Sequence, residues 1–164
     1  MGIRLLAVGA LSLALMTTAL GGQAAARQAV ATKTDYYVVN FSPNGAQFID
    51  VAGMQIKGSD AMYWTTVVMP GSQDHAYSMW LNHLDCAGRR TRVLMANFYS
   101  AQGAQLRSVA GPTDWKPITA GSSGETFIDI ACKGTRPGED AHLGEVAPVV
   151  LYEAFQKSVQ TPGK

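Results

Sequence analysis

The sequence predicts an α+β protein, with a single antiparallel β-sheet of about six strands, a C-terminal α-helix packed against the sheet, and one disulfide. Three observations lead to this fold class. Short runs rich in β-branched and aromatic residues alternate with turn residues over most of the chain. A helical apolar pattern occurs near the C-terminus, and a pair of cysteines follows what resembles an export signal.

Residues 1–26 have the layout of a secretory signal peptide. They begin with one basic residue, Arg4, continue with an uncharged apolar stretch from Leu5 to Leu20, and end with small residues at Ala24 and Ala26. We expect cleavage after Ala26. The alternative is an uncleaved single-span anchor, but the apolar stretch is short for a span of roughly 20 apolar residues and is rich in Gly, Ser and Thr.

The remaining chain divides into a flexible lead at residues 27–34, a single domain at 35–160 and a flexible tail at 161–164. Such a chain is expected in the periplasm, at the cell surface or in the medium. No stable membrane span is expected after signal cleavage. No cysteine lies near the cleavage region, which argues against a lipid anchor attached there.

Charge argues against two classes of partner. The full chain has 13 Lys and Arg against 12 Asp and Glu, and cleavage removes Arg4 but no acid, so the mature chain is neutral. Nucleic-acid binding depends on a basic surface that neutralises phosphates, and an anionic membrane surface attracts polybasic segments. We therefore expect no nucleic-acid partner, and extracellular or envelope proteins instead. The sequence leaves open whether the chain forms a homodimer.

The first four strands are predicted from runs of aromatic and β-branched residues between turn residues. They occupy residues 35–41, 46–58, 61–69 and 76–85. The Asn-Gly pair in "SPNG" at 42–45 tolerates positive φ and predicts a hairpin turn between the first two strands. Gly53 predicts a bulge or break within the second strand.

The next predicted strand, at residues 90–99, carries mixed side chains on both faces. Strict alternation places Arg90, Arg92, Leu94, Ala96 and Phe98 on one face and Thr91, Val93, Met95, Asn97 and Tyr99 on the other. Neither face is cleanly polar. We therefore expect a central strand whose second face is partly covered by a helix or loop.

Beyond that strand, "AQLRSVA" at residues 104–110 continues the sheet. Residues 111–124 form a long connection with a short extended piece around Trp115. "ETFIDIAC" at 125–132 predicts a last strand, in which alternation places Thr126, Ile128, Ile130 and Cys132 on one face.

The C-terminal region holds the one good helical pattern. The apolar residues Val149, Leu151, Tyr152, Phe155 and Val159 recur at helical spacing. Pro148 suits the first turn of a helix, so we place the helix start near Pro148 and read residues 141–147 as a first turn or loop. The apolar stripe would pack against the sheet.

Cys86 and Cys132 predict a structural disulfide. In an oxidising compartment an even number of cysteines favours pairing, and two cysteines allow one pairing only. Leu84 shares a strand face with Cys86, and Cys132 lies on the apolar face of its predicted strand, so the two cysteines sit on strand faces able to meet. Closing this loop stabilises the fold by roughly 3–4 kcal/mol.

No catalytic residue, metal ligand or cofactor is expected. His83, Asp85 and Cys86, with His75 upstream, are the candidate metal ligands, but Cys86 points away on a strand and its thiolate is used by the disulfide. The alternative is that they are surface or hydrogen-bonded residues. "AGSSGE" around Ser122 and Ser123 does not match G-x-S-x-G and suits a polar turn. Glu125 and Asp129 share a face at strand spacing and could do acid–base work. Without a predicted cleft, we expect a solvent-exposed strand face instead.

The residues Arg89, Arg90 and Arg92 form the candidate binding surface. Arg90 and Arg92 lie on one face with Arg89 opposite, an arrangement able to bind an acidic partner or a glycan. The alternative is that they are solvated or paired with acids such as Asp85. The three tryptophans, Trp64, Trp80 and Trp115, are expected as core or half-buried packing.

The order of motifs from residue 85 to residue 132 resembles the surface-adhesin protein E family. The segment "DCAGRRTRVLMANFYSAQGAQLRSVAGPTDWKPITAGSSGETFIDIAC" has a polar-Cys pair, a strand ending in two aromatic residues, an x-x-G turn, a Trp-x-x-Ile segment, and a Gly/Ser-rich step before an acid and a closing Cys. The similarity extends more loosely to residues 35–134. It implies an antiparallel sheet with a packed helix and a cysteine pair, and a surface that binds host matrix or plasma proteins.

This chain departs from the name-giving adhesin in two respects. That adhesin is lipid-anchored, whereas no cysteine for such an anchor is present here. Its host-protein binding is linked to basic residues before the first cysteine, whereas "GSQDHAYSMWLNHLD" contains none. The resemblance therefore transfers fold better than ligand.

Export, the lack of a catalytic signature and the resemblance predict a non-enzymatic exported binding module. The alternative is a periplasmic structural or envelope-associated protein without adhesive activity. An enzyme ranks last, because it would need a pocket that collects His83, Asp85 or a serine of the glycine-rich turn.

Overall fold

The computed structural model of the chain describes residues 33–160. The predicted signal peptide at 1–26, most of the predicted lead and the tail at 161–164 lie outside the described residues. Within residues 33–160, no helix is long and apolar enough to cross a membrane.

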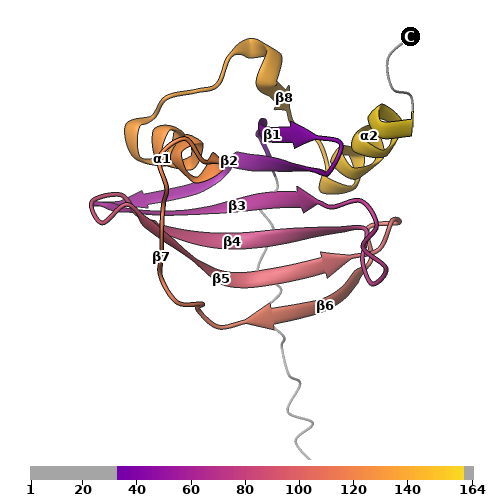
Figure 1. Cartoon of the computed structure of the whole chain (residues 1–164), viewed down its shortest axis with the longest axis horizontal. Helices are drawn as coiled ribbons and strands as arrows, with labels where there is room; N and C mark the ends of the chain where they lie inside the picture. Colours follow the sequence, from indigo (N-terminus) through magenta and orange to yellow (C-terminus); the bar gives the residue numbers. More distant parts are fainter. Residues whose placement is uncertain (1–32, 161–164) are drawn as a thin grey trace, which may run out of the picture. The chain divides into compact units, whose positions relative to one another are not determined.

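An antiparallel β-sheet forms the body of the described domain (Figure 1). Its strands run in the order β6-β5-β4-β3-β2-β1-β8, and the short β7 pairs with β5 beside β6. The strand bounds are β1 Tyr36–Ser42, β2 Gly45–Lys57, β3 Asp60–Val68, β4 Tyr77–Asp85, β5 Arg90–Tyr99, β6 Gln105–Ala110, β7 Lys116–Pro117 and β8 His142–Gly144. The predicted antiparallel sheet is confirmed, and β8, which extends it beyond β1, was not predicted.

The turn between β1 and β2 lies where the Asn-Gly pair predicts it. Ser42 pairs with Gly45, so Pro43 and Asn44 form the turn and Gly45 begins β2. Gly45 has φ +149°, and a Cβ placed there would lie 2.7 Å from the Val68 carbonyl oxygen of β3. Glycine is thus required because the neighbouring backbone approaches closely.

The bulge predicted near Gly53 is also present. The β2–β3 register shifts between Asp50 and Gln55. Asp50 is buried there, and its Oδ1 accepts hydrogen bonds from the backbone N–H groups of Asp35 and Ala52, each at 3.0 Å. These bonds satisfy a carboxylate that burial would otherwise penalise.

The sheet buries a separate hydrophobic cluster on each of its two faces. We call one the α2 face, whose buried cluster includes Phe48, Val68 and Tyr77 together with residues of the C-terminal helix. The other is the α1 face, whose cluster includes Ile49, Tyr63 and Leu84 together with residues of an earlier helix. Consecutive strand residues such as Phe48 and Ile49 point to opposite faces, so the two helices pack on opposite sides of the sheet.

Helix α2 spans Pro148–Gln160 and begins at the predicted residue. Its Leu151 and Phe155 are buried against the α2 face. Phe155 packs edge-on against Phe41, with 5.5 Å between ring centroids. The predicted C-terminal helix and its packing on the sheet are therefore confirmed.

The strand predicted at residues 125–132 is wrong. Residues Ser123–Lys133 form helix α1, whose Ile128, Ile130 and Ala131 are buried on the α1 face. The alternation of apolar residues in so short a run fits a helix as well as a strand. The helix forms because it packs these residues against the α1 face, where the strands beneath already have a partner on each side.

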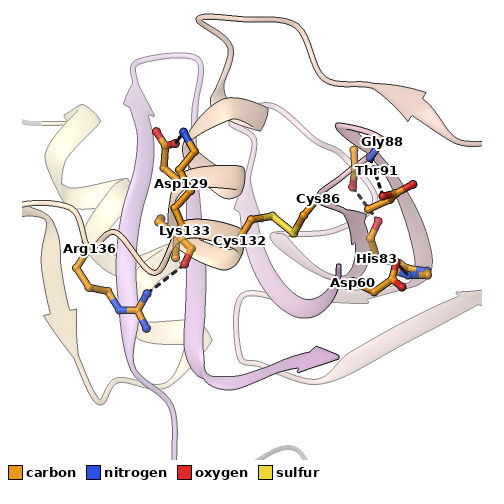
Figure 2. Close-up of a disulfide and its surroundings, with 11 residues drawn as sticks. Asp60, His83, Cys86, Gly88, Thr91, Asp129, Cys132, Lys133 and Arg136 are labelled. Carbon is orange, nitrogen blue, oxygen red and sulfur yellow. Dashed lines mark hydrogen bonds and ion pairs between the residues drawn. A yellow bond between two sulfur atoms is a disulfide. The ribbon is translucent and has the colours of Figure 1, made fainter. Parts of the chain in front are cut away.

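The Cys86–Cys132 disulfide is confirmed. Figure 2 shows Cys132 reaching from α1 to Cys86, which directly follows β4. Their Cα atoms are 5.8 Å apart, within the usual range for a disulfide. The expectation that both cysteines lie on strands is wrong, because Cys132 lies in α1 and Cys86 in the turn after β4, so the bond attaches a helix to the end of a strand.

The strict alternation predicted for β5 breaks at Leu94. The β4–β5 register shifts there: Asn82 pairs with Val93, whereas Leu81 pairs with Met95. This β-bulge moves Ala96 to the same face as Val93, contrary to the prediction that it shares a face with the arginines.

Candidate functional site

Trp115 contacts the predicted arginines Arg90 and Arg92 at the end of β5 that pairs with β7. Strand β7 pairs Lys116 with Thr91 of the α1 face, so the preceding Trp115 points to the α2 face, where Arg90 and Arg92 lie. The guanidinium carbon of Arg92 lies 4.4 Å from the Trp115 ring centroid and that of Arg90 lies 4.8 Å from it. Both distances are typical of cation–π contacts.

His83 of β4 completes what we call the Trp115 cluster, which consists of His83, Arg90, Arg92 and Trp115. The His83 ring lies 4.9 Å from the Trp115 ring. Its Nδ1 accepts hydrogen bonds from Nε and Nη2 of Arg92 at 3.3 and 3.2 Å, and its Nε2 lies 3.0 Å from Oδ1 of Asp60. Because a guanidinium only donates, this geometry requires the Nε2–H tautomer, which donates to Asp60.

Arg90 is oriented by the turn between β4 and β5. Its Nε donates to Oδ2 of Asp85 at 2.8 Å, and the backbone N–H of Gly88 donates to the other carboxylate oxygen at 2.8 Å. The Gly88 N–H and then Arg90 hold the pKa of Asp85 below its usual range. The pairing of Arg90 with Asp85, an alternative raised by the sequence, is thus present together with the stacking on Trp115.

Arg89 does not join the cluster. It has φ +46°, and its Nη2 donates to Oε1 of Glu125 in α1 at 3.0 Å. The backbone N–H of Gly121 and then Arg89 lower the pKa of Glu125. The predicted set of three arginines is therefore divided: Arg89 faces the helix, as its opposite orientation predicted, while Arg90 and Arg92 lie together.

The Trp115 cluster offers a cationic and aromatic surface. The side chain of Arg90 is 49% exposed, and Trp115 is half-buried, as Trp64 and Trp80 also are. A guanidinium only donates hydrogen bonds, and the N–H groups of Arg90 and Arg92 that Asp85 and His83 do not use are able to donate to a carboxylate. The cluster thus places two cationic side chains and an aromatic ring together at the surface.

The candidate metal and catalytic residues are engaged in local hydrogen bonds. In the part of the chain that the structure describes, no group of three His, Cys, Asp or Glu is placed to hold a metal ion. Asp74 is hydrogen-bonded to Nδ1 of His75 and accepts a hydrogen bond from the Ser72 hydroxyl, and these two bonds lower the pKa of Asp74 to about 2. Ser122 precedes α1 and donates to the Thr119 carbonyl at 2.6 Å, as a turn residue does.

Sequence reasoning missed Asp60 and assigned Trp115 only to packing. The extended piece predicted around Trp115 could have indicated that its side chain lies beside the arginines. An extended segment beside β5 must place every second side chain over one face, and Arg90 and Arg92 occupy that face. The role of Asp60 depends on the β3–β4 register, which no local pattern reveals.

Comparison with known proteins identifies the family. The chain matches the model of surface-adhesin protein E over residues 36–133. It belongs to the surface-adhesin protein E family. The matched region runs from the first residue of β1 to the last residue of α1, and so includes the disulfide and the Trp115 cluster of this protein E relative. No curated protein and no solved structure matches the chain significantly.

Membership of the protein E family and the disulfide both indicate an exported protein. Helix α2 and strand β8 lie beyond the family match.

Proposed function

We propose that this chain is an exported, non-enzymatic adhesin-like module that binds an extracellular or envelope protein through the Trp115 cluster. The observation that supports this best is the stacking of Arg90 and Arg92 on Trp115. Such a group combines two of the residue types that contribute most at protein interfaces, Trp and Arg, and fixes their positions before a partner arrives.

The ligand class follows from the cluster's charge. The acids next to the cluster, Asp60 and Asp85, already contact His83 and Arg90 from within the protein. The remaining guanidinium N–H groups have no acidic partner among these residues, so the partner surface should carry carboxylates. An acidic segment of a matrix or plasma protein meets this requirement.

The test is binding of the purified mature chain to immobilised matrix and plasma proteins by surface plasmon resonance. Saturable binding is expected, and Arg92→Gln combined with Trp115→Leu should weaken it by at least about tenfold, because central Arg and Trp contacts typically contribute more than 1 kcal/mol each. Binding should also weaken with added salt.

Arg136→Gln is the matched control, because it removes the same charge from the loop after α1, where Arg136 Nη1 donates to the Ile130 carbonyl. Equal loss in both variants would show a general charge effect and contradict the assignment of the Trp115 cluster. Circular dichroism of each variant checks that the fold is retained.

The second candidate is a periplasmic structural or envelope-associated protein without adhesive activity. The disulfide and the family fit this role as well, since both require export only. Cell fractionation and surface labelling distinguish the two roles. A protein confined to the soluble periplasm, without saturable binding to host proteins, would favour the second.

A further inference from the structure

A groove on the α1 face lies on the opposite side of the sheet from the Trp115 cluster. Its volume is about 540 Å³, within the range of small-molecule sites. The floor is formed by side chains of the middle strands, among them Thr65, Trp80 and Ala96. The first turn of α1 forms one wall and the segment that contains β7 forms the other.

Aromatic side chains dominate the apolar part of this groove. Tyr63 and Phe127 lie with 5.3 Å between ring centroids at the α1 end, and the half-buried Trp80 lies on the floor. The indole N–H of Trp80 already donates to Ser78 Oγ at 2.9 Å, so the ring offers its apolar surface to the groove. The body of a ligand here should be flat or flexible and apolar.

Several polar groups in the groove are already hydrogen-bonded within the protein. The Asn82 amide donates to Thr65 Oγ1 and to the Trp80 carbonyl, both at 3.0 Å. Thr91 Oγ1 donates to the His83 carbonyl, and Thr113 Oγ1 accepts from the Val93 N–H. A sugar needs many unengaged donors and acceptors, and this lining does not supply them.

Lys116 supplies charge at the wall of the groove. It makes no ion pair with any residue in the described range 33–160, and none of the residues that line the groove is acidic. Arg92, the other cationic lining residue, has its guanidinium on the far face against His83 and Trp115. One accessible ammonium beside an apolar groove favours a single anionic group on the ligand.

We propose that this groove binds a small amphipathic carboxylate, with the apolar body against Trp80 and Phe127 and the carboxylate at Lys116. This site is separate from the proposed adhesive surface and does not depend on it. The first turn of α1, with Ser123 and Gly124, forms the opposite wall, and the positive end of its helix dipole adds to the attraction for an anion.

The test uses 2-naphthoate as the probe and 2-naphthamide as its neutral match, titrated into the purified chain with the disulfide intact. Calorimetry should give a dissociation constant on the order of 0.1–1 mM for naphthoate, as expected for a ligand of this size. The amide should bind at least about fivefold more weakly, because it lacks the charge that Lys116 recognises. In NMR spectra, amide shifts should centre on Ala96, Lys116 and Gly124.

Two variants locate the site. Lys116→Gln should weaken naphthoate binding about tenfold, the effect expected for loss of one charge-assisted hydrogen bond, whereas Lys157→Gln on α2 removes the same charge from the other face and should leave binding unchanged. Ala96→Leu should abolish binding by filling the floor. The proposal is overturned if wild type does not bind naphthoate, if naphthamide binds equally well, or if Lys116→Gln and Lys157→Gln behave alike.

Discussion

At the scale of single residues, burial of tyrosine hydroxyls is the most consequential feature of the sheet. Tyr36 is fully buried, and its hydroxyl oxygen accepts a hydrogen bond from Thr66 Oγ1 at 3.3 Å. Burial raises the pKa of Tyr36 to about 12, raises that of Tyr63 further, and raises that of Tyr77 to about 12. The folded state thus prefers the protonated phenol of each residue.

These tyrosines predict the alkaline limit of stability. Because each folded-state pKa is raised above the unfolded value of about 10, the stabilisation is complete below about pH 10 and is lost as the pH rises toward the folded-state values. Unfolding should therefore coincide with tyrosinate formation, followed by ultraviolet absorbance and circular dichroism in parallel. Tyr63→Phe should move the transition to higher pH. Ionisation of all tyrosines near pH 10 in a folded protein would contradict this prediction.

At the scale of elements, helix α1 shows where sequence reasoning failed and which signals it passed over. Ser122 followed by Glu125 is the S-x-x-E pattern of a helix start, and Gly134 has the left-handed conformation common after a helix end, at φ +70°. The β-branched residues in the run favoured a strand locally. The strands β1 to β6 were predictable because each run is bounded by turn residues, whereas β8 is three residues long and depends on its pairing with β1.

The disulfide predicts how α1 is held. Replacing both cysteines in a Cys86→Ser, Cys132→Ser variant should lower the free energy of unfolding by roughly 3–4 kcal/mol, because the unfolded chain regains the freedom of a loop spanning 46 residues. Urea denaturation measures this loss. Hydrogen exchange should rise more in α1 than in β3, since β3 is paired on both sides. A wild-type protein treated with reductant should match the variant, and equal stability before and after reduction would refute the prediction.

At the scale of the whole described domain, one helix covers each face of the sheet, and each has its own buried cluster. The sequence predicted the sheet, the terminal helix and the disulfide. It expected a helix or loop over part of the second face of the strand at 90–99, whereas helix α1 packs mainly over β1, β2 and β3. Which face a residue occupies depends on bulges such as that at Leu94, and bulges arise from pairing between strands and not from one strand's own pattern.

This arrangement predicts energetic independence of the two clusters. Ile130→Val on the α1 face should cost about 1 kcal/mol and Phe155→Ala on the α2 face about 3–5 kcal/mol, and the double variant should equal their sum within about 0.5 kcal/mol. Urea denaturation of the four proteins in the cycle measures this. Phe41→Leu with Phe155→Ala is the comparison pair, whose rings are in contact and should not be additive.

Because each helix covers its own face of the sheet, the Trp115 cluster and the groove lie on opposite faces, separated by a single layer of strands. A macromolecule docked on one side would not obstruct a small molecule entering from the other. Occupancy of both sides at once, in a ternary complex, is therefore sterically free. Any influence of one ligand on the other would pass through segments that contribute to both sites, such as β5 with Arg92 and Val93 and the chain at β7 with Trp115 and Lys116.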